Sequence, residues 1–191
     1  MKKRTAFIGA ILSLIPLSQP LIFKTGFSLS TVGLILSASQ GVKAEDAEIY
    51  NTKGMKKHYE NDHYGAISNY TKAIQMSPNV GEYYYNRGLS KNQIKDYEGA
   101  ISDFTKAIEL KPQFADAYRD RGLSHAELGD YYAAISDGNK AIKYNPKDFK
   151  AFFNLGIDKQ AIGDFKGACD AWRKASALDD EKAVKVLRTY C

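Results

Sequence analysis

The chain has 191 residues, of which 44% are hydrophobic and 26% are charged, and its formal net charge is +5. A chain of this length suits one domain preceded by a leader. The positive excess lies in residues 1–44, which contain five Lys or Arg and no Asp or Glu. Residues 45–191 balance 22 basic against 22 acidic residues, which argues against a nucleic-acid-binding protein.

The leader has the composition of an export signal. Three cations at positions 2–4 precede an apolar run at residues 6–17, the order found in secretory signal peptides. Small residues at positions 42 and 44 allow cleavage before Glu45, and prolines and Lys24 interrupt the apolar stretch before it reaches the roughly 20 residues of a transmembrane helix. We expect cleavage and export to a periplasm, a lumen or the extracellular space. An uncleaved leader that anchors the protein in a membrane is the alternative.

The residues after the leader repeat with a period of 34. Small residues and prolines recur in one gap-free frame over about residues 47–180, and Asp180 stands where a fourth proline would fall. The recurring residues are Gly54, Gly88, Gly122 and Gly156; Ala66, Ala100, Ala134 and Ala168; Ala73, Ala107, Ala141 and Ala175; and Pro78, Pro112 and Pro146. Such a period is typical of solenoids built from helix–turn–helix units.

On these residues the chain resembles the tetratricopeptide repeat (TPR) family. The resemblance implies an all-α, right-handed superhelical solenoid of four helix–turn–helix units, at about residues 47–80, 81–114, 115–148 and 149–180. Residues 181–191 carry apolar side chains at helical spacing, and we expect them to form a capping helix. The expected domains are therefore a leader at 1–44, a TPR domain at 45–180 and the capping helix.

Each unit is expected to contain two helices joined by a short turn. In the second unit the helices are predicted at residues 82–94 and 98–110. An aspartate before each second helix is a good N-cap; these residues are Asp62, Asp96, Asp130 and Asp164. Gly138 stands where the other three units have an aromatic residue, so we expect either a neighbour that fills the gap or a soft point in the solenoid.

A second regularity joins two positions that lie sixteen residues apart. Unit two carries Arg87 with Asp103, and unit three carries Arg121 with Asp137. Unit four has apolar residues at both positions. Because the two positions change together, we expect them to touch as ion pairs.

The cysteines and histidines indicate neither a metal site nor a cofactor. Cys169 and Cys191 lack zinc-ligand spacing; a buried thiol and a frayed one is the favoured interpretation, with a disulfide as the alternative. His58 and His63 are five residues apart, which does not bring them together on a helix, so packing explains them better than ligation. Phosphate-binding loops and serine- or zinc-hydrolase motifs are absent from the sequence, and we expect no catalytic residues and no enzyme.

The family resemblance implies where a partner binds. In TPR solenoids the first helices of successive units line a concave groove that holds a peptide segment of another protein. Carrying these positions over predicts the groove residues Asn51, Tyr85, Asn86, Leu89, Arg119, Asp120, Leu123, Phe153, Asn154 and Ile157. Asn86 and Asn154 would hold the peptide backbone, whereas aromatic residues and arginine are the usual anchors for side chains.

Some family members bind acidic chaperone tails with a carboxylate clamp. At the corresponding positions here Asn86 fits, but Asp116 and Asp120 would repel a carboxylate, so no chaperone partner of this kind is expected. The sequence predicts a protein–protein adaptor or scaffold whose partner is an unidentified protein or peptide. A membrane-tethered assembly factor that retains its leader is the first alternative, and an enzyme with an unrecognised site is the second.

Overall fold

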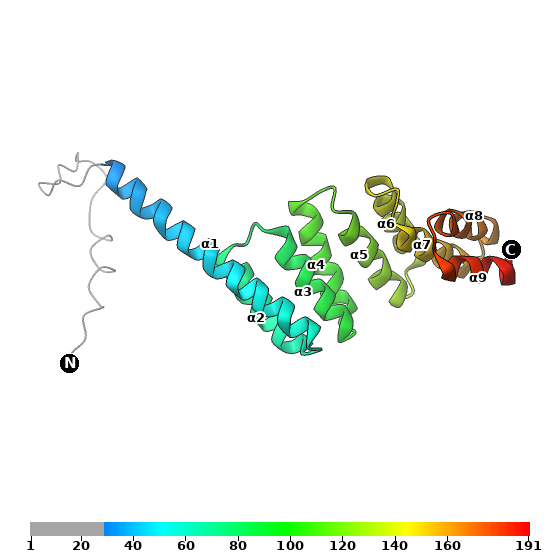
Figure 1. Cartoon of the computed structure of the whole chain (residues 1–191), viewed down its shortest axis with the longest axis horizontal. Helices are drawn as coiled ribbons and strands as arrows, with labels where there is room; N and C mark the ends of the chain where they lie inside the picture. Colours follow the sequence, from blue (N-terminus) through cyan, green and yellow to red (C-terminus); the bar gives the residue numbers. More distant parts are fainter. Residues whose placement is uncertain (1–28) are drawn as a thin grey trace, which may run out of the picture. The chain divides into compact units, whose positions relative to one another are not determined.

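The computed structural model describes the backbone of residues 29–191 and the side chains of residues 44–191. The chain divides into two units, Met1–Ser39 and Gln40–Cys191, and the second contains the repeats. The signal sequence expected at residues 2–17 lies outside the described residues. The described part is built from α-helices and contains no strand (Figure 1). The helices are α1 (Leu29–Tyr59), α2 (His63–Met76), α3 (Gly81–Gln93), α4 (Tyr97–Leu110), α5 (Ala115–Glu127), α6 (Tyr131–Tyr144), α7 (Phe149–Ala161), α8 (Phe165–Ser176) and α9 (Glu181–Tyr190).

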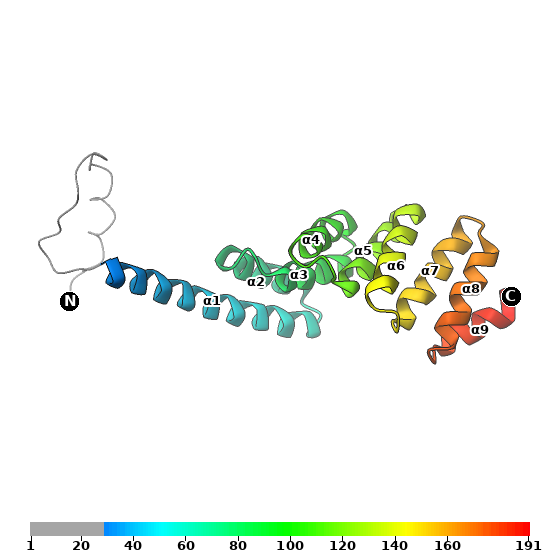
Figure 2. The ribbon, with the colours of Figure 1, turned by 90° about the horizontal axis from the view of Figure 1, so that it is seen from above.

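Successive helices pack as pairs. Helix α3 packs on α4, α5 on α6 and α7 on α8, and each pair contacts the next through α2–α3, α4–α5 and α6–α7. Figures 1 and 2 show the pairs following one another from α2 to α8. Helix α9 packs on α8, as expected for a capping helix. The all-α solenoid is confirmed, and α3 and α4 begin and end within one residue of their predicted bounds.

The first helix is longer than the sequence predicts. Unit one is expected to begin near residue 47, but α1 already begins at Leu29 and continues to Tyr59. It passes through the expected cleavage position, so cleavage before Glu45 would leave residues 45–59 as the first helix of unit one. Within the described residues, no helix combines the length and the apolar character that crossing a membrane requires.

The predicted N-caps are confirmed in all four units. Asp62, Asp96 and Asp164 each accept a hydrogen bond from the backbone N–H of a glycine three residues further on, at 2.9, 3.0 and 2.9 Å. Asp130 accepts one from Ala133 at 3.0 Å. Each cap stabilises its helix by about 1 kcal/mol, and together they set where the second helix of every unit begins.

A glycine on the first helix of three units makes room for an aromatic ring on the second. A Cβ atom on Gly54 or Gly88 would lie 2.6 or 2.7 Å from the nearest ring atom, and Gly156 is covered by a ring in the same way. The rings belong to Tyr70, Phe104 and Trp172, which are almost fully buried. The helices of these pairs can approach closely only because the first carries no side chain at the point of contact.

Unit three lacks this ring, and its gap is filled from the next unit. A Cβ atom on Gly122 would meet the backbone oxygen of Ala134 at 3.2 Å instead of a ring. Gly138 is buried, and a Cβ atom there would lie 3.6 Å from Leu155 Cδ1, an ordinary contact distance. A leucine of α7 therefore covers the position where the other units have an aromatic side chain.

The arginine–aspartate pairs are confirmed, and they extend to a third residue. Arg87 of α3 donates from Nε and Nη2 to the carboxylate of Asp103 on α4, at 2.9 and 2.7 Å. Its Nη1 donates to Thr71 Oγ1 on α2 at 3.1 Å. The guanidinium thus joins the second helices of two successive units, an arrangement that we call a Thr–Arg–Asp bridge.

A second Thr–Arg–Asp bridge follows one unit later. Arg121 of α5 donates to Asp137 at 2.8 and 2.7 Å and to Thr105 of α4 at 3.0 Å. The threonines of the two bridges were not predicted from the sequence, although Thr71 and Thr105 also lie one period apart. In unit four Leu155 replaces the arginine, and it packs over Gly138 instead.

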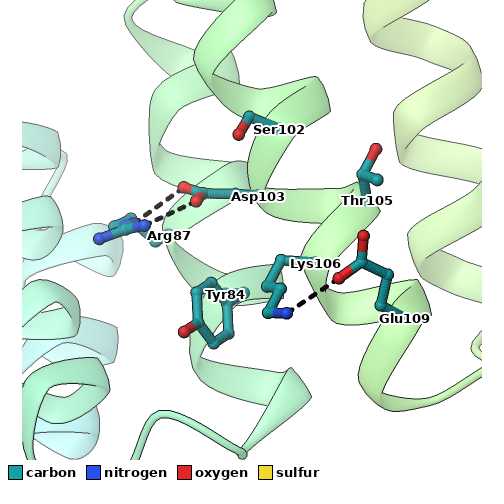
Figure 3. A pocket seen from close by; sticks show the side chains of 7 residues that line it. All are labelled: Tyr84, Arg87, Ser102, Asp103, Thr105, Lys106 and Glu109. Carbon is teal, nitrogen blue, oxygen red and sulfur yellow. Dashed lines mark hydrogen bonds and ion pairs between the residues drawn. The ribbon is translucent and has the colours of Figure 1, made fainter.

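A pocket beside the first bridge belongs to this packing. Its lining residues, which come from α3 and α4, are Tyr84, Arg87, Ser102, Asp103, Thr105, Lys106 and Glu109 (Figure 3). Figure 3 shows Arg87 directed at Asp103 and Lys106 at Glu109, and the second pair has an Nζ–Oε2 distance of 2.9 Å. The four charges neutralise one another, so this pocket offers no unpaired charge to a ligand.

The interpretation of the two cysteines as free thiols is wrong. Cys169 of α8 and Cys191, directly after α9, form a disulfide with their Cα atoms 5.9 Å apart. Helix α9 starts directly after Asp180, whose carboxylate caps it by accepting a hydrogen bond from the backbone N–H of Lys182 at 3.0 Å. Helix α9 then packs on α8. The pairing depends on how α9 lies along α8, and the 34-residue repeat does not specify this.

Candidate peptide-binding groove

The ten predicted groove residues lie on the first helices of the four units, α1, α3, α5 and α7. Asn51 and Asp120 are buried, Leu123 and Ile157 are each 43% exposed, and the other six are partly buried. Their side chains belong to two internal hydrogen-bond networks, an exposed apolar strip and an open pocket. The ten residues therefore differ in role: some hold neighbouring helices together through hydrogen bonds, and others are open to a partner.

The first network joins units one and two. Asn86 Nδ2 donates to Asn51 Oδ1 at 3.0 Å, and Asn51 Nδ2 donates to Glu48 Oε1 at 3.1 Å. The hydroxyl of Tyr83 donates to the other oxygen of Glu48 at 2.9 Å. Burial, together with this carboxylate, raises the pKa of Tyr83 to about 12. Asn86, predicted to hold a peptide backbone, therefore already has a partner within the chain.

The second network centres on Arg119 of α5. Its Nε and Nη2 donate to Asp120 at 3.0 and 3.2 Å. Its Nη1 donates to Asp116 at 2.6 Å and to Asp148 at 2.7 Å. From α3, the hydroxyl of Tyr85 donates to Asp120 at 2.7 Å. The guanidinium thus connects α5 to the residue that precedes α7, and Asp120 connects α5 to α3 through Tyr85.

Electrostatics make this network a structural clamp between helices. Burial and the neighbouring Asp120 raise the pKa of Tyr85, which keeps its hydroxyl protonated. Burial alone would lower the pKa of Arg119, but the carboxylates of Asp120 and Asp148 outweigh it and raise the pKa. Because three aspartates face one arginine, an anionic ligand would meet net negative charge here.

An open pocket of about 320 Å³ lies between α5, α7 and the first turn of α9. We call it the α5–α7–α9 pocket. Five of its residues are predicted groove residues: Arg119, Asp120, Leu123, Phe153 and Asn154. The other four, which the sequence analysis missed, are Phe149, Lys150, Asp180 and Lys182. Two of these belong to the turn and helix of the cap, whose position over α7 the repeat pattern does not define.

Some polar side chains of this pocket already bind other groups of the chain, and others do not. Asp180 is occupied as the N-cap of α9, and Asp120 is held by the second network. Within the described residues, Lys150 and Lys182 form no ion pair, and the side-chain amide of Asn154 forms no hydrogen bond. The pocket therefore combines apolar walls with cationic and amide groups that can bind a ligand.

An apolar strip runs along the first helices and leads into this pocket. Met55, Leu123 and Ile157 are 38, 43 and 43% exposed, and Leu89 is partly buried between them. These four residues occupy the same position of their units. Large apolar side chains gathered on one exposed face are typical of a surface that binds another protein.

A further set of contacts between first helices was missed from the sequence. Ser90 Oγ of α3 lies 2.8 Å from His58 Nδ1 of α1. One unit later, Ser124 Oγ of α5 donates to Asn92 Oδ1 of α3 at 2.9 Å. Both serines are completely buried, and each hydroxyl has two partners: a backbone oxygen four residues earlier in its own helix and the side chain from the preceding unit.

Unit four breaks this pattern at Asp158. The residue takes the position of the two serines, and the partner position in unit three is held by Ala126. Asp158 is 5% exposed and forms no side-chain hydrogen bond with the rest of the described chain. Burial raises the pKa of its carboxyl to about 7.

His58 and His63 lie on different helices, at the end of α1 and the start of α2. The turn between these helices brings the two ring centroids to 5.1 Å, a proximity that their spacing in the sequence did not predict. Burial and the charge of His63 lower the pKa of His58. Even so, residues 44–191 contain no cluster of three or more His, Cys, Asp or Glu side chains that could hold a metal ion.

Comparison with known proteins agrees with the observed repeats. The tetratricopeptide repeat family matches residues 81–114 and 115–148, the second and third units. No curated protein matches the sequence. The crystal structure of MamA is similar at 24% identity and a TM-score of 0.68, covering 81% of this chain and 88% of MamA. The Arabidopsis OM64 TPR domain is similar at 24% identity and a TM-score of 0.61, covering 62% of this chain and 98% of that domain.

A third similar structure contains a bound peptide. It is the first TPR of Spaghetti (RPAP3) bound to the HSP90 peptide SRMEEVD, with 26% identity, a TM-score of 0.62 and coverage of 63% of this chain and 95% of that one. The matched repeats coincide with two units of the gap-free frame, and the helix pairs of the fold continue that frame on both sides. Residues 81–148 therefore belong to the tetratricopeptide repeat family, and the helix pairs on both sides have the same fold.

Proposed function

We propose that this protein is a non-enzymatic adaptor or scaffold that binds a segment of another protein in the groove formed by α1, α3, α5 and α7. The observation that carries the proposal is the exposed apolar strip that leads into the α5–α7–α9 pocket, where Lys150 and Asn154 lack partners in the described part of the chain. The peptide bound to the similar RPAP3 repeat supports the same use of the fold.

The contacts within the chain divide the groove residues into two roles. Tyr85, Asn86 and Arg119 bind neighbouring side chains and so hold the helices in place. The partner-contacting role falls to Leu123 and Ile157 of the strip, with the other strip residues and the walls of the pocket.

A crosslinking pull-down from the native host tests this function. The double variant Leu123→Glu, Ile157→Glu adds two charges to the strip, and we expect it to lose the partner that the wild type captures. Ser68→Glu, Ser136→Glu is the matched control, because it adds the same charge at exposed positions of α2 and α6. A partner that both variants retain, or that both lose equally, would place binding outside the groove.

We also propose that the protein is exported after loss of its leader. The Cys169–Cys191 disulfide supports an oxidising compartment. The competing proposal is a membrane-tethered assembly factor that keeps the leader. The intact mass of the protein purified from its host distinguishes the two: a chain beginning near residue 45 supports export, and a full-length chain in the membrane fraction supports the tether.

A further inference from the structure

We propose that the Cys169–Cys191 disulfide controls partner binding at the α5–α7–α9 pocket: the pocket binds its peptide tightly when the disulfide is formed and weakly when it is reduced. The proposal rests on the function proposed above and adds its regulation. It follows from the position of α9, which both supplies part of the pocket and carries one end of the disulfide.

Helix α9 is a wall of the pocket with little packing of its own. Its residue Lys182 and its N-cap Asp180 line the pocket. The helix has ten residues, and Ala183 is its buried residue; Val186 and Leu187 are partly buried against α8. Helices this short are unstable by themselves in water, so α9 keeps its place only through its attachments to the solenoid.

The disulfide is the covalent attachment at the far end of α9. It closes a loop of 22 residues between α8 and the residue after α9. By chain entropy alone, closing such a loop favours the attached state by roughly two orders of magnitude. Reduction therefore increases the fraction of molecules in which α9 has left its place.

A chain of contacts also connects the disulfide end of α9 with the pocket wall on α7. The ring of Tyr190 lies 6.3 Å from that of Trp172, centroid to centroid. Trp172 Nε1 donates to the backbone oxygen of Phe153 at 3.1 Å, and Phe153 lines the pocket. Release of α9 thus disturbs two walls, through Lys182 directly and through Trp172 indirectly.

The chemistry is a thiol–disulfide exchange. A protein dithiol of the thioredoxin class attacks the disulfide, supplies two electrons and two protons, and is itself oxidised to a disulfide, leaving Cys169 and Cys191 as thiols. The attack is sterically open because Cys191 is exposed.

The first test follows α9 in the full-length chain, with the disulfide intact or reduced by dithiothreitol. We expect reduction to speed hydrogen exchange in α9 at least tenfold and to change the emission of Trp172, the one tryptophan of the sequence, while α3 and α4 stay unchanged. Cys191→Ser should behave as the reduced protein with or without dithiothreitol. Equal protection of α9 in both states, or free thiols in the purified oxidised chain, would overturn the proposal.

The second test measures binding with peptides selected from a displayed random library on the oxidised chain. Peptides that Leu123→Glu, Ile157→Glu no longer binds are groove ligands. We expect reduction to weaken their binding at least fivefold, and dithiothreitol to have no effect on Cys191→Ser. Equal affinity in both redox states would refute the redox control but leave the groove function standing. If no selected peptide depends on the groove, the proposed function fails as well.

Discussion

Gly138 shows how a single missing ring changes the packing of a repeat. Substitution by alanine should raise the melting temperature by roughly 2–4 °C, because alanine favours a helix over glycine by about 1 kcal/mol and its methyl would meet Leu155 Cδ1 at 3.6 Å. Thermal unfolding followed by circular dichroism measures the change. Gly122→Ala is the control and should lower the melting temperature, since its methyl would lie 3.2 Å from the backbone oxygen of Ala134. An unchanged or lower value for Gly138→Ala would show that the position requires glycine.

Asp158 should make the stability of the fold depend on pH in an unusual direction. Its folded pKa of about 7 lies above the ordinary value of 3.8, so the fold favours the protonated form. Stability therefore falls as the pH rises from about 4 to about 7, and the full cost of the buried carboxylate is present above pH 7. We expect Asp158→Asn to raise the free energy of unfolding at pH 8 by on the order of 2 kcal/mol, with a smaller gain at pH 5. Urea unfolding at both pH values tests this, and an equal gain at the two would exclude titration as the cause.

Single residues divide clearly into those that the sequence could predict and those that it could not. The N-cap aspartates and small residues recur every 34 residues because each unit packs in the same way. The partners of Asn86 and Arg119 depend on residues that occur once, such as Asp148 at the end of unit three. The positions carried over from the family therefore identified the helices that form the groove. They did not reveal which groove side chains already have hydrogen-bond partners within the chain.

At the level of the helix pair, the Thr–Arg–Asp bridges hold second helices together. We expect Arg121→Leu to cost about 3 kcal/mol, because it leaves the buried carboxylate of Asp137 unpaired. Adding Asp137→Ala should recover most of this loss, since unit four already carries an apolar pair at these positions. Urea unfolding of both variants checks the prediction. A double variant no more stable than the single one would show that the bridge does more than neutralise a buried charge.

The helices also show where a repeat pattern loses its predictive power. The bounds of α3 and α4 follow from hydrophobic spacing, caps and the proline after each unit. Helix α9 lies outside the repeat, so its direction over α8, and with it the disulfide and two residues of the pocket, had no periodic counterpart. Helix α1 begins at Leu29 for the same reason, since residues before the frame have no equivalent in later units.

Across the whole solenoid, the interface between units three and four should be the weakest. It lacks a Thr–Arg–Asp bridge because Leu155 replaces the arginine, and it contains Gly138 and the unpartnered carboxyl of Asp158. In a solenoid, stability is approximately a sum of such neighbour interfaces. At pH 8 in low denaturant, the amides of α7, α8 and α9 should therefore exchange before those of α3 and α4.

Native-state hydrogen exchange with mass spectrometry measures this order. The double variant Gly138→Ala, Asp158→Asn removes two of the three weaknesses. It should therefore reduce the difference in exchange rate between the amides of α7, α8 and α9 and those of α3 and α4. Simultaneous loss of protection along the whole solenoid, or earlier exchange in α3 and α4, would contradict the prediction.

The Thr–Arg–Asp bridge also determines how the molecule could be lengthened. Residues 81–114 carry at one edge an arginine that needs a threonine from the preceding unit, and at the other edge a threonine that serves the next arginine. A tandem duplication of this segment would place each copy beside a complementary edge, and the groove would gain one first helix without a new unmatched charge. Unit four has no such arginine. Growth by duplication is thus compatible with the middle of the array and disfavoured at its capped end.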